Sequence, residues 1–218
     1  MRISAFSKFA ACGLALVILS ACGAKRGDLD MSGQGIVQFR NNCPTVAVAA
    51  QTGDITLFDP ASSREASAID VVANITDLRS TCATVGDDFY TEVTYAVNAL
   101  RRDAGAAREV DLPVFSTVVR GGTSVIAKRI TTIRLSFSAG SLRAHATGQT
   151  GAYVNREAAT VPPDVLNMVN RRRRTGDADA ALDPLQRPEV KEALQRSSFE
   201  LLLGFNLTSD QLRYNVTR

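Results

Sequence analysis

Apolar and polar residues alternate with a period of two along most of the chain from Ile36 onward. Such alternation places apolar side chains on one face of each segment and is typical of half-buried β-strands. The segments that show it are 46–48, 55–57, 69–76, 92–99, 110–114, 126–130, 133–137 and 199–207. The chain is therefore predicted to be mainly β.

Short connections with turn-forming residues separate the strands in the middle of the chain. They are residues 103–105, 120–123 and 138–141. The Gly-Gly pair in the second of them suits a two-residue turn that requires positive φ angles. We therefore expect four consecutive strands, from about Tyr90 to Tyr153, to form an antiparallel meander.

Two positions interrupt the strand pattern in this region. Pro113 cannot donate a backbone hydrogen bond, which predicts either an edge strand or a bulge at that residue. Ile126 and Ile130 have the opposite parity from Ile133 and the apolar residues after it. The change of parity predicts a β-bulge near residues 131–132.

The pattern becomes charged, punctuated by proline and helical in spacing between residues 161 and 197. Pro163 and Pro188 each suit the first turn of a helix, with apolar residues following at helical intervals. We expect a short helical insertion at about 161–197, before the last strand. A final helical turn is expected within 209–218.

Seven or eight short strands with one helical excursion favour an antiparallel β-sandwich of immunoglobulin-like architecture. A closed β-barrel is the alternative. The chain contains no tryptophan, which sets it apart from true immunoglobulin domains. Residues 36–218 are expected to form a single β-rich domain, and they resemble no family that we identify.

The N-terminal leader has a basic start, Met1 to Lys8, and an apolar run from Phe9 to Leu19 that is too short to cross a bilayer. Its end, Leu19-Ser20-Ala21-Cys22, resembles the lipobox of bacterial lipoproteins. The resemblance implies that residues 1–21 are a signal peptide. It also implies a diacylglyceryl group and an acyl chain on Cys22. The alternative is an ordinary signal peptide with an unmodified Cys22.

Residues 22–35 are small, polar and rich in glycine, which is typical of a flexible tether. Multiple acyl chains on one residue attach a protein firmly to a membrane. The residue after Cys22 is Gly23 and not the aspartate that tends to retain enterobacterial lipoproteins in the inner membrane. By this analogy, the expected location is the outer membrane of a bacterial cell envelope, with the domain in the periplasm.

Cys43 and Cys82 are the two cysteines that remain beyond the lipobox. An even pair in an oxidising compartment favours a disulfide bond. Two buried free thiols are the alternative. Neither cysteine belongs to a Cys-x-x-Cys pair, so a redox-active or zinc site is not expected.

The sequence offers no convincing catalytic or metal-binding constellation. His145 is the only histidine, and although Ser138, Ser141 and Asp111 could be combined with it, no serine has a nucleophile motif around it. The acidic pair at 87–88 lacks the spacing of a calcium loop and reads as a solvated turn. We therefore expect no enzyme activity, no metal and no cofactor other than the lipid on Cys22.

The charge of the chain does not indicate nucleic-acid binding. The formal net charge is +3, and Arg2 and Lys8 of the leader contribute two of these charges. The strongest local feature is a run of four arginines, which could clamp phosphate or carboxylate groups of a partner: Arg171, Arg172, Arg173 and Arg174. The aspartates that follow could instead neutralise a solvated loop.

These observations favour a lipid-anchored, non-catalytic envelope protein that acts as a binding or assembly module. Its expected partners are the membrane, through the anchor, and an unidentified envelope protein. A carrier of a lipid or other apolar ligand and an envelope hydrolase of unrecognised type are the alternatives.

Overall fold

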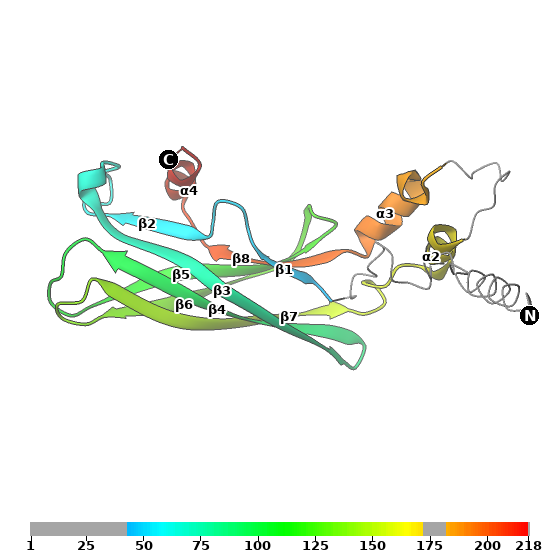
Figure 1. Cartoon of the computed structure of the whole chain (residues 1–218), viewed down its shortest axis with the longest axis horizontal. Helices are drawn as coiled ribbons and strands as arrows, with labels where there is room; N and C mark the ends of the chain where they lie inside the picture. Colours follow the sequence, from blue (N-terminus) through cyan, green and yellow to red (C-terminus); the bar gives the residue numbers. More distant parts are fainter. Residues whose placement is uncertain (1–42, 172–181, 218) are drawn as a thin grey trace, which may run out of the picture. The chain divides into compact units, whose positions relative to one another are not determined.

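The computed structural model describes residues 43–171 and 182–217, which belong to one compact unit of the chain, 41–218. Its strands form two four-stranded sheets (Figure 1). Sheet 1 has the order β1 (Thr45–Val48), β8 (Phe199–Phe205), β5 (Arg108–Arg120), β6 (Ser124–Phe137). Sheet 2 has the order β2 (Asp54–Phe58), β3 (Ile69–Val85), β4 (Asp88–Arg101), β7 (Arg143–Asn155).

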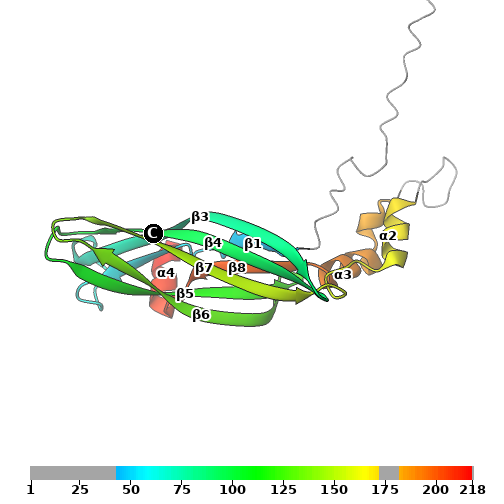
Figure 2. The same cartoon turned by 90° about the horizontal axis from the view of Figure 1, so that it is seen from below.

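The two sheets pack through their apolar faces, because alternate residues of each strand point into the space between them. Figure 2 shows β3 and β4 on one side of the sandwich and β5 and β6 on the other. The fully buried side chains of this core include Val71, Val93, Val97, Leu112, Leu135, Phe137, Leu203 and Phe205. The predicted β-sandwich is confirmed.

The predicted meander is wrong. β4 pairs with β3 and β7, whereas β5 pairs with β6 and β8. The connections 102–107 and 138–142 therefore cross from one sheet to the other. Only β5 and β6 form the expected hairpin, and its Gly121 and Gly122 have the predicted positive φ angles of 63° and 77°.

Pro113 lies in an inner strand rather than at an edge, because β5 is flanked by β8 and β6. The ladder between β5 and β8 ends at the pair Val114 and Phe205, so the missing N–H of Pro113 falls just beyond it. The predicted bulge is also misplaced. The register shifts at Ile126, and pairing continues without interruption from Ala127 through Phe137.

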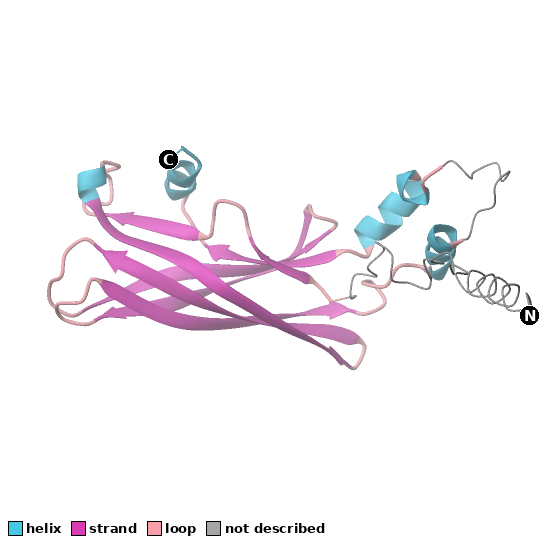
Figure 3. Cartoon of the chain, viewed as in Figure 1, coloured by secondary structure: helices cyan, strands magenta, loops and turns pink. Residues whose placement is uncertain are grey.

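The helical insertion before the last strand is confirmed and consists of α2 (Pro163–Asn170), the 3-10 turn η3 (Pro184–Gln186) and α3 (Pro188–Arg196). Figure 3 shows α2 and α3 outside the sheets. They share a small apolar cluster formed by Val165, Val190 and Ala193. Another 3-10 turn, η2 (Ala66–Ala68), precedes β3.

The C-terminal α4 (Ser209–Thr217) is longer than the single turn expected from the sequence. The Asn215 side-chain amide donates to the backbone oxygens of Gln51 (3.0 Å) and Asp54 (2.9 Å). The ring of Tyr214 meets Phe58 of β2 edge to face. These contacts hold α4 against β2. No helix in the described part of the chain is long and apolar enough to span a membrane.

The short strand β1 runs parallel to β8, with Thr45 opposite Glu200. The chain therefore enters the sandwich beside the start of β8. Because α3 ends just before β8, the point of entry and the helical insertion lie at the same end of the sheets. We call this the entry end.

Candidate functional site

A disulfide joins Cys43 to Cys82, 39 residues later in the chain, as predicted. Cys43 lies two residues before β1 of sheet 1, and Cys82 belongs to β3 of sheet 2. The bond therefore links the two sheets covalently at the entry end. It fixes the first described residue of the chain to the opposite sheet.

The remaining predicted contact residues fall largely outside the described part of the chain. Cys22, the proposed tether 22–35 and Arg172 to Arg174 are not among the described residues. Arg171 directly follows α2, at the entry end. The lipid attachment and the anion-binding role of the arginine run stay predictions.

The groups that could form a histidine-based catalytic triad are not brought together. His145 lies on the outer face of sheet 2, where its Nδ1 is 3.0 Å from Oδ1 of Asn98. Asp111 lies on the outer face of sheet 1 and accepts two hydrogen bonds from Arg134, at 2.8 and 3.0 Å. Hydrogen bonding to Arg134 lowers the pKa of the Asp111 carboxyl group.

The acidic candidates serve local structure. Asp87 pairs with Arg156 (3.5 Å) in the turn between β3 and β4, where Gly86 supplies a φ angle of 59°. Asp183 caps η3 by accepting a hydrogen bond from the Leu185 N–H at 2.9 Å. In the described ranges, no three His, Cys, Asp or Glu side chains gather as they would around a metal ion.

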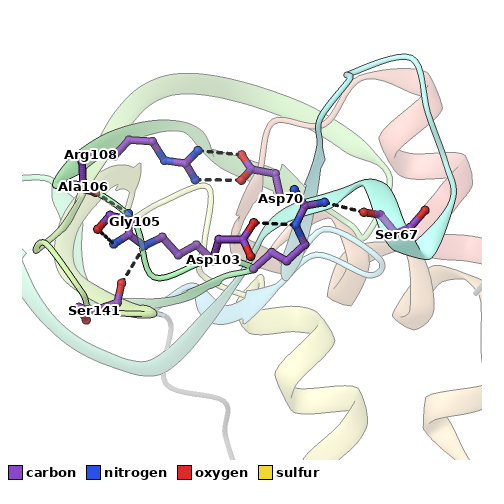
Figure 4. Close-up of polar contacts among 9 residues, drawn as sticks. Ser67, Asp70, Asp103, Gly105, Ala106, Arg108 and Ser141 are labelled. Atoms are coloured by element: carbon purple, nitrogen blue, oxygen red, sulfur yellow. Dashed lines mark hydrogen bonds and ion pairs between the residues drawn. The ribbon is translucent and has the colours of Figure 1, made fainter.

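Arg101 has a structural role that the sequence does not predict. Only 4% of it is exposed. Its Nε donates to the Ser141 carbonyl (2.7 Å), its Nη1 to Ala106 (2.8 Å), and its Nη2 to Gly105 and Ser138 (3.0 and 3.1 Å). In Figure 4, Gly105 and Ala106 of one connection between the sheets and Ser141 of the other lie around the same group of donors. One guanidinium group thus holds the two crossings together.

The neighbouring arginines are paired with carboxylates. Arg108 makes two parallel 3.1 Å hydrogen bonds to Asp70 of β3 (Figure 4). Arg102 bonds to Asp103 at 3.0 Å, and this hydrogen bond raises the pKa of the Arg102 guanidinium group. These arginines lie at the end of the sandwich opposite the entry end. Because they are already paired with carboxylates, they do not form an open anion site there.

The most exposed regular element is the first part of β6, residues 124–132, which we call the β6 edge. All nine of its residues are exposed, including three large apolar side chains, Val125 (62%), Ile126 (55%) and Ile130 (53%). Within the described residues, β6 pairs only with β5. The outer side of the β6 backbone thus offers unpaired N–H and C=O groups.

The β6 edge is basic as well as apolar. Lys128 lies over the ring of Phe115, 5.0 Å from its centroid, and its Nζ is 3.2 Å from Oδ1 of Asn206. Arg129 follows it on the other face of the strand. Neither β6 nor β7, one of the two edge strands of sheet 2, contains an aspartate or glutamate. The combination of a free strand edge, apolar side chains and positive charge makes this the candidate functional site.

Comparisons with protein families, curated proteins and solved structures find no match to this chain.

Proposed function

We propose that this chain is a lipid-anchored lipoprotein of the bacterial envelope, with its β-sandwich acting as a non-catalytic binding or assembly module. In this proposal, acyl chains on Cys22 hold it to the outer membrane and the sandwich lies in the periplasm. The order of basic start, apolar run and Leu19-Ser20-Ala21-Cys22 supports the anchor.

The disulfide between Cys43 and Cys82 is the observation that carries the proposal. Structural disulfides persist in oxidising compartments such as the periplasm and are rare in the cytosol. The leader would deliver the chain to such a compartment. The two features lie in separate parts of the chain, yet they point to the same environment.

The exposed β6 edge supports a binding role. Long exposed strand edges with apolar side chains are uncommon in soluble proteins because they pair with other chains. Here the edge belongs to a sandwich whose sheets are linked by a disulfide. The proposed tether would leave this edge accessible to a membrane-associated partner. The proposed partner is another protein of the envelope.

The anchor is tested by replacing the proposed lipidated residue. We expect Cys22→Ala to abolish incorporation of labelled palmitate. The variant should be found either in the soluble fraction or as a precursor that keeps its leader. The matched control is Cys12→Ala, which removes a thiol from the part of the leader that cleavage discards. Mass spectrometry of the mature wild-type N-terminus should show a chain that begins at residue 22 with acyl groups attached.

Two results would contradict the anchor. One is a mature wild-type chain with an unmodified thiol at Cys22. The other is equal membrane association of the wild type and of Cys22→Ala whose leader has been cleaved, after high-salt washing, which removes proteins held by surface charge alone.

A further inference from the structure

The β6 edge has the features of a site for strand addition. Extended peptides bind exposed sheet edges by continuing the backbone hydrogen-bond ladder, and side chains at alternate positions give specificity. The other edge of sheet 1 is β1, which has only four residues, most of them half-buried. Sheet 2 has two edge strands: α4 packs against β2, and no two consecutive residues of β7 are exposed. The β6 edge is the long exposed alternative.

The charges of the edge select the occupant. Lys128 and Arg129 are adjacent in the strand, so their side chains point to opposite faces of the sheet. An added strand that carried two adjacent carboxylates opposite them would place one negative charge on each face. Ile130 and Val125, on either side of the two cations, offer apolar contacts to the flanking residues of that strand.

A second copy of the same chain fits this edge poorly. If two β6 edges paired antiparallel about their middle, Lys128 and Arg129 of one copy would lie opposite the same residues of the other. Like charges directly opposite each other in a sheet are destabilising. Edge lysines are a known device against such self-association, and the bulge at Ile126 also disturbs a continuous self-pairing.

We infer that the β6 edge binds an extended segment of a partner protein, in which adjacent acidic residues are flanked by apolar ones, by adding it as a fifth strand to sheet 1. This inference rests on the proposed binding function and specifies its partner. The occupant is defined by its chemistry: a free backbone, a central pair of carboxylates and β-branched neighbours.

The test uses full-length protein purified in detergent micelles and a capped peptide of sequence Thr-Val-Thr-Glu-Glu-Val-Thr-Val-Thr. A second peptide has Lys-Lys in place of Glu-Glu, and a third keeps Glu-Glu but has methylated backbone nitrogens. We expect the acidic peptide to bind at least about tenfold more tightly than the basic one, since two exposed ion pairs are replaced by two repulsions. Backbone methylation should abolish binding, because it removes the ladder donors.

Two double variants distinguish the effect of the charges at the β6 edge from the effect of the net charge of the protein. Lys128→Glu/Arg129→Glu should reverse the preference, so that the basic peptide binds better. Arg143→Glu/Lys191→Glu changes the net charge equally at exposed positions elsewhere and should leave the preference unchanged. Hydrogen exchange of amides within residues 124–132 should slow when the acidic peptide is added to the wild type.

Equal affinity for the acidic and basic peptides, or no binding by either, would overturn the inference. So would slow exchange of the β6 edge amides in peptide-free protein that forms dimers, because the occupant would then be a second copy. A lipidated chain that ignores the acidic peptide contradicts only this inference. A chain that binds the peptide but lacks lipid on Cys22 contradicts only the proposed anchor.

Discussion

Replacement of Arg101 by methionine is expected to lower the free energy of unfolding by about 3–5 kcal/mol. The guanidinium group is buried and donates to four backbone carbonyls of two different connections. Methionine retains much of the aliphatic stem, but it loses the guanidinium group that lies over the ring of Phe137 and offers no donor. The hydrogen bonds that are lost have a charged donor, and such bonds contribute more to stability than neutral ones. Urea unfolding of the oxidised protein measures the change.

Arg102→Met is the matched control, since it removes the same charge from the next residue. Arg102 is exposed, and we expect its replacement to leave the unfolding midpoint almost unchanged. Arg101→Lys should resemble Arg101→Met rather than the wild type, because one ammonium group cannot reach both connections as a planar guanidinium does. Equal midpoints for Arg101→Met and Arg102→Met would show that the four hydrogen bonds contribute nothing to stability.

The strands could be predicted from the sequence, but their distribution between two sheets could not. β4 and β5 each bury alternate residues, and this alternation is the same whichever sheet a strand joins. The loops 102–107 and 138–142 contain turn-forming residues, which favour a hairpin when only local sequence is considered. What decides the crossing lies far away in sequence, in the pairing of β5 with β8 and of β4 with β7.

Arg101 could have been identified from its position. It has the same parity in β4 as Val93, Val97 and Ala99, so the pattern places it on the apolar face. A charged residue at such a position needs hydrogen-bond partners. Those partners are backbone carbonyls, and backbone groups leave no trace in the amino-acid sequence. The pattern therefore indicates that Arg101 is buried, but not which groups its guanidinium binds.

The β6 edge leaves a signal in the sequence, but that signal fits two structures. The opposite parity of Ile130 and Ile133 predicts a bulge only if both side chains are buried. The structure instead leaves Ile130 exposed on the outer face while Ile133 enters the core. Periodicity reports which residues share a face, but it does not report whether anything covers that face.

The disulfide, by contrast, followed from the compartment implied by the leader, and its removal should have the second large effect. We expect reduction, or the variant Cys43→Ala/Cys82→Ala, to lower the free energy of unfolding by about 4 kcal/mol, since the bond closes a loop across 39 residues. For a protein of this size, the loss corresponds to a decrease of roughly 10 °C in Tm. Thermal unfolding followed by circular dichroism, with and without reductant, measures it.

The effect should be concentrated at the entry end. β1 is a strand of four residues that pairs only with β8 in the described part of the chain, and Cys43 lies two residues before it. Without the disulfide, the amides of β1 should exchange with solvent much faster, while those of β4 remain protected up to global unfolding. Reductant should not change the Tm of Cys43→Ala/Cys82→Ala any further. If the oxidised wild type and this variant unfolded at the same temperature, the bond between the sheets would be dispensable, and β1 would be held by its pairing with β8 alone.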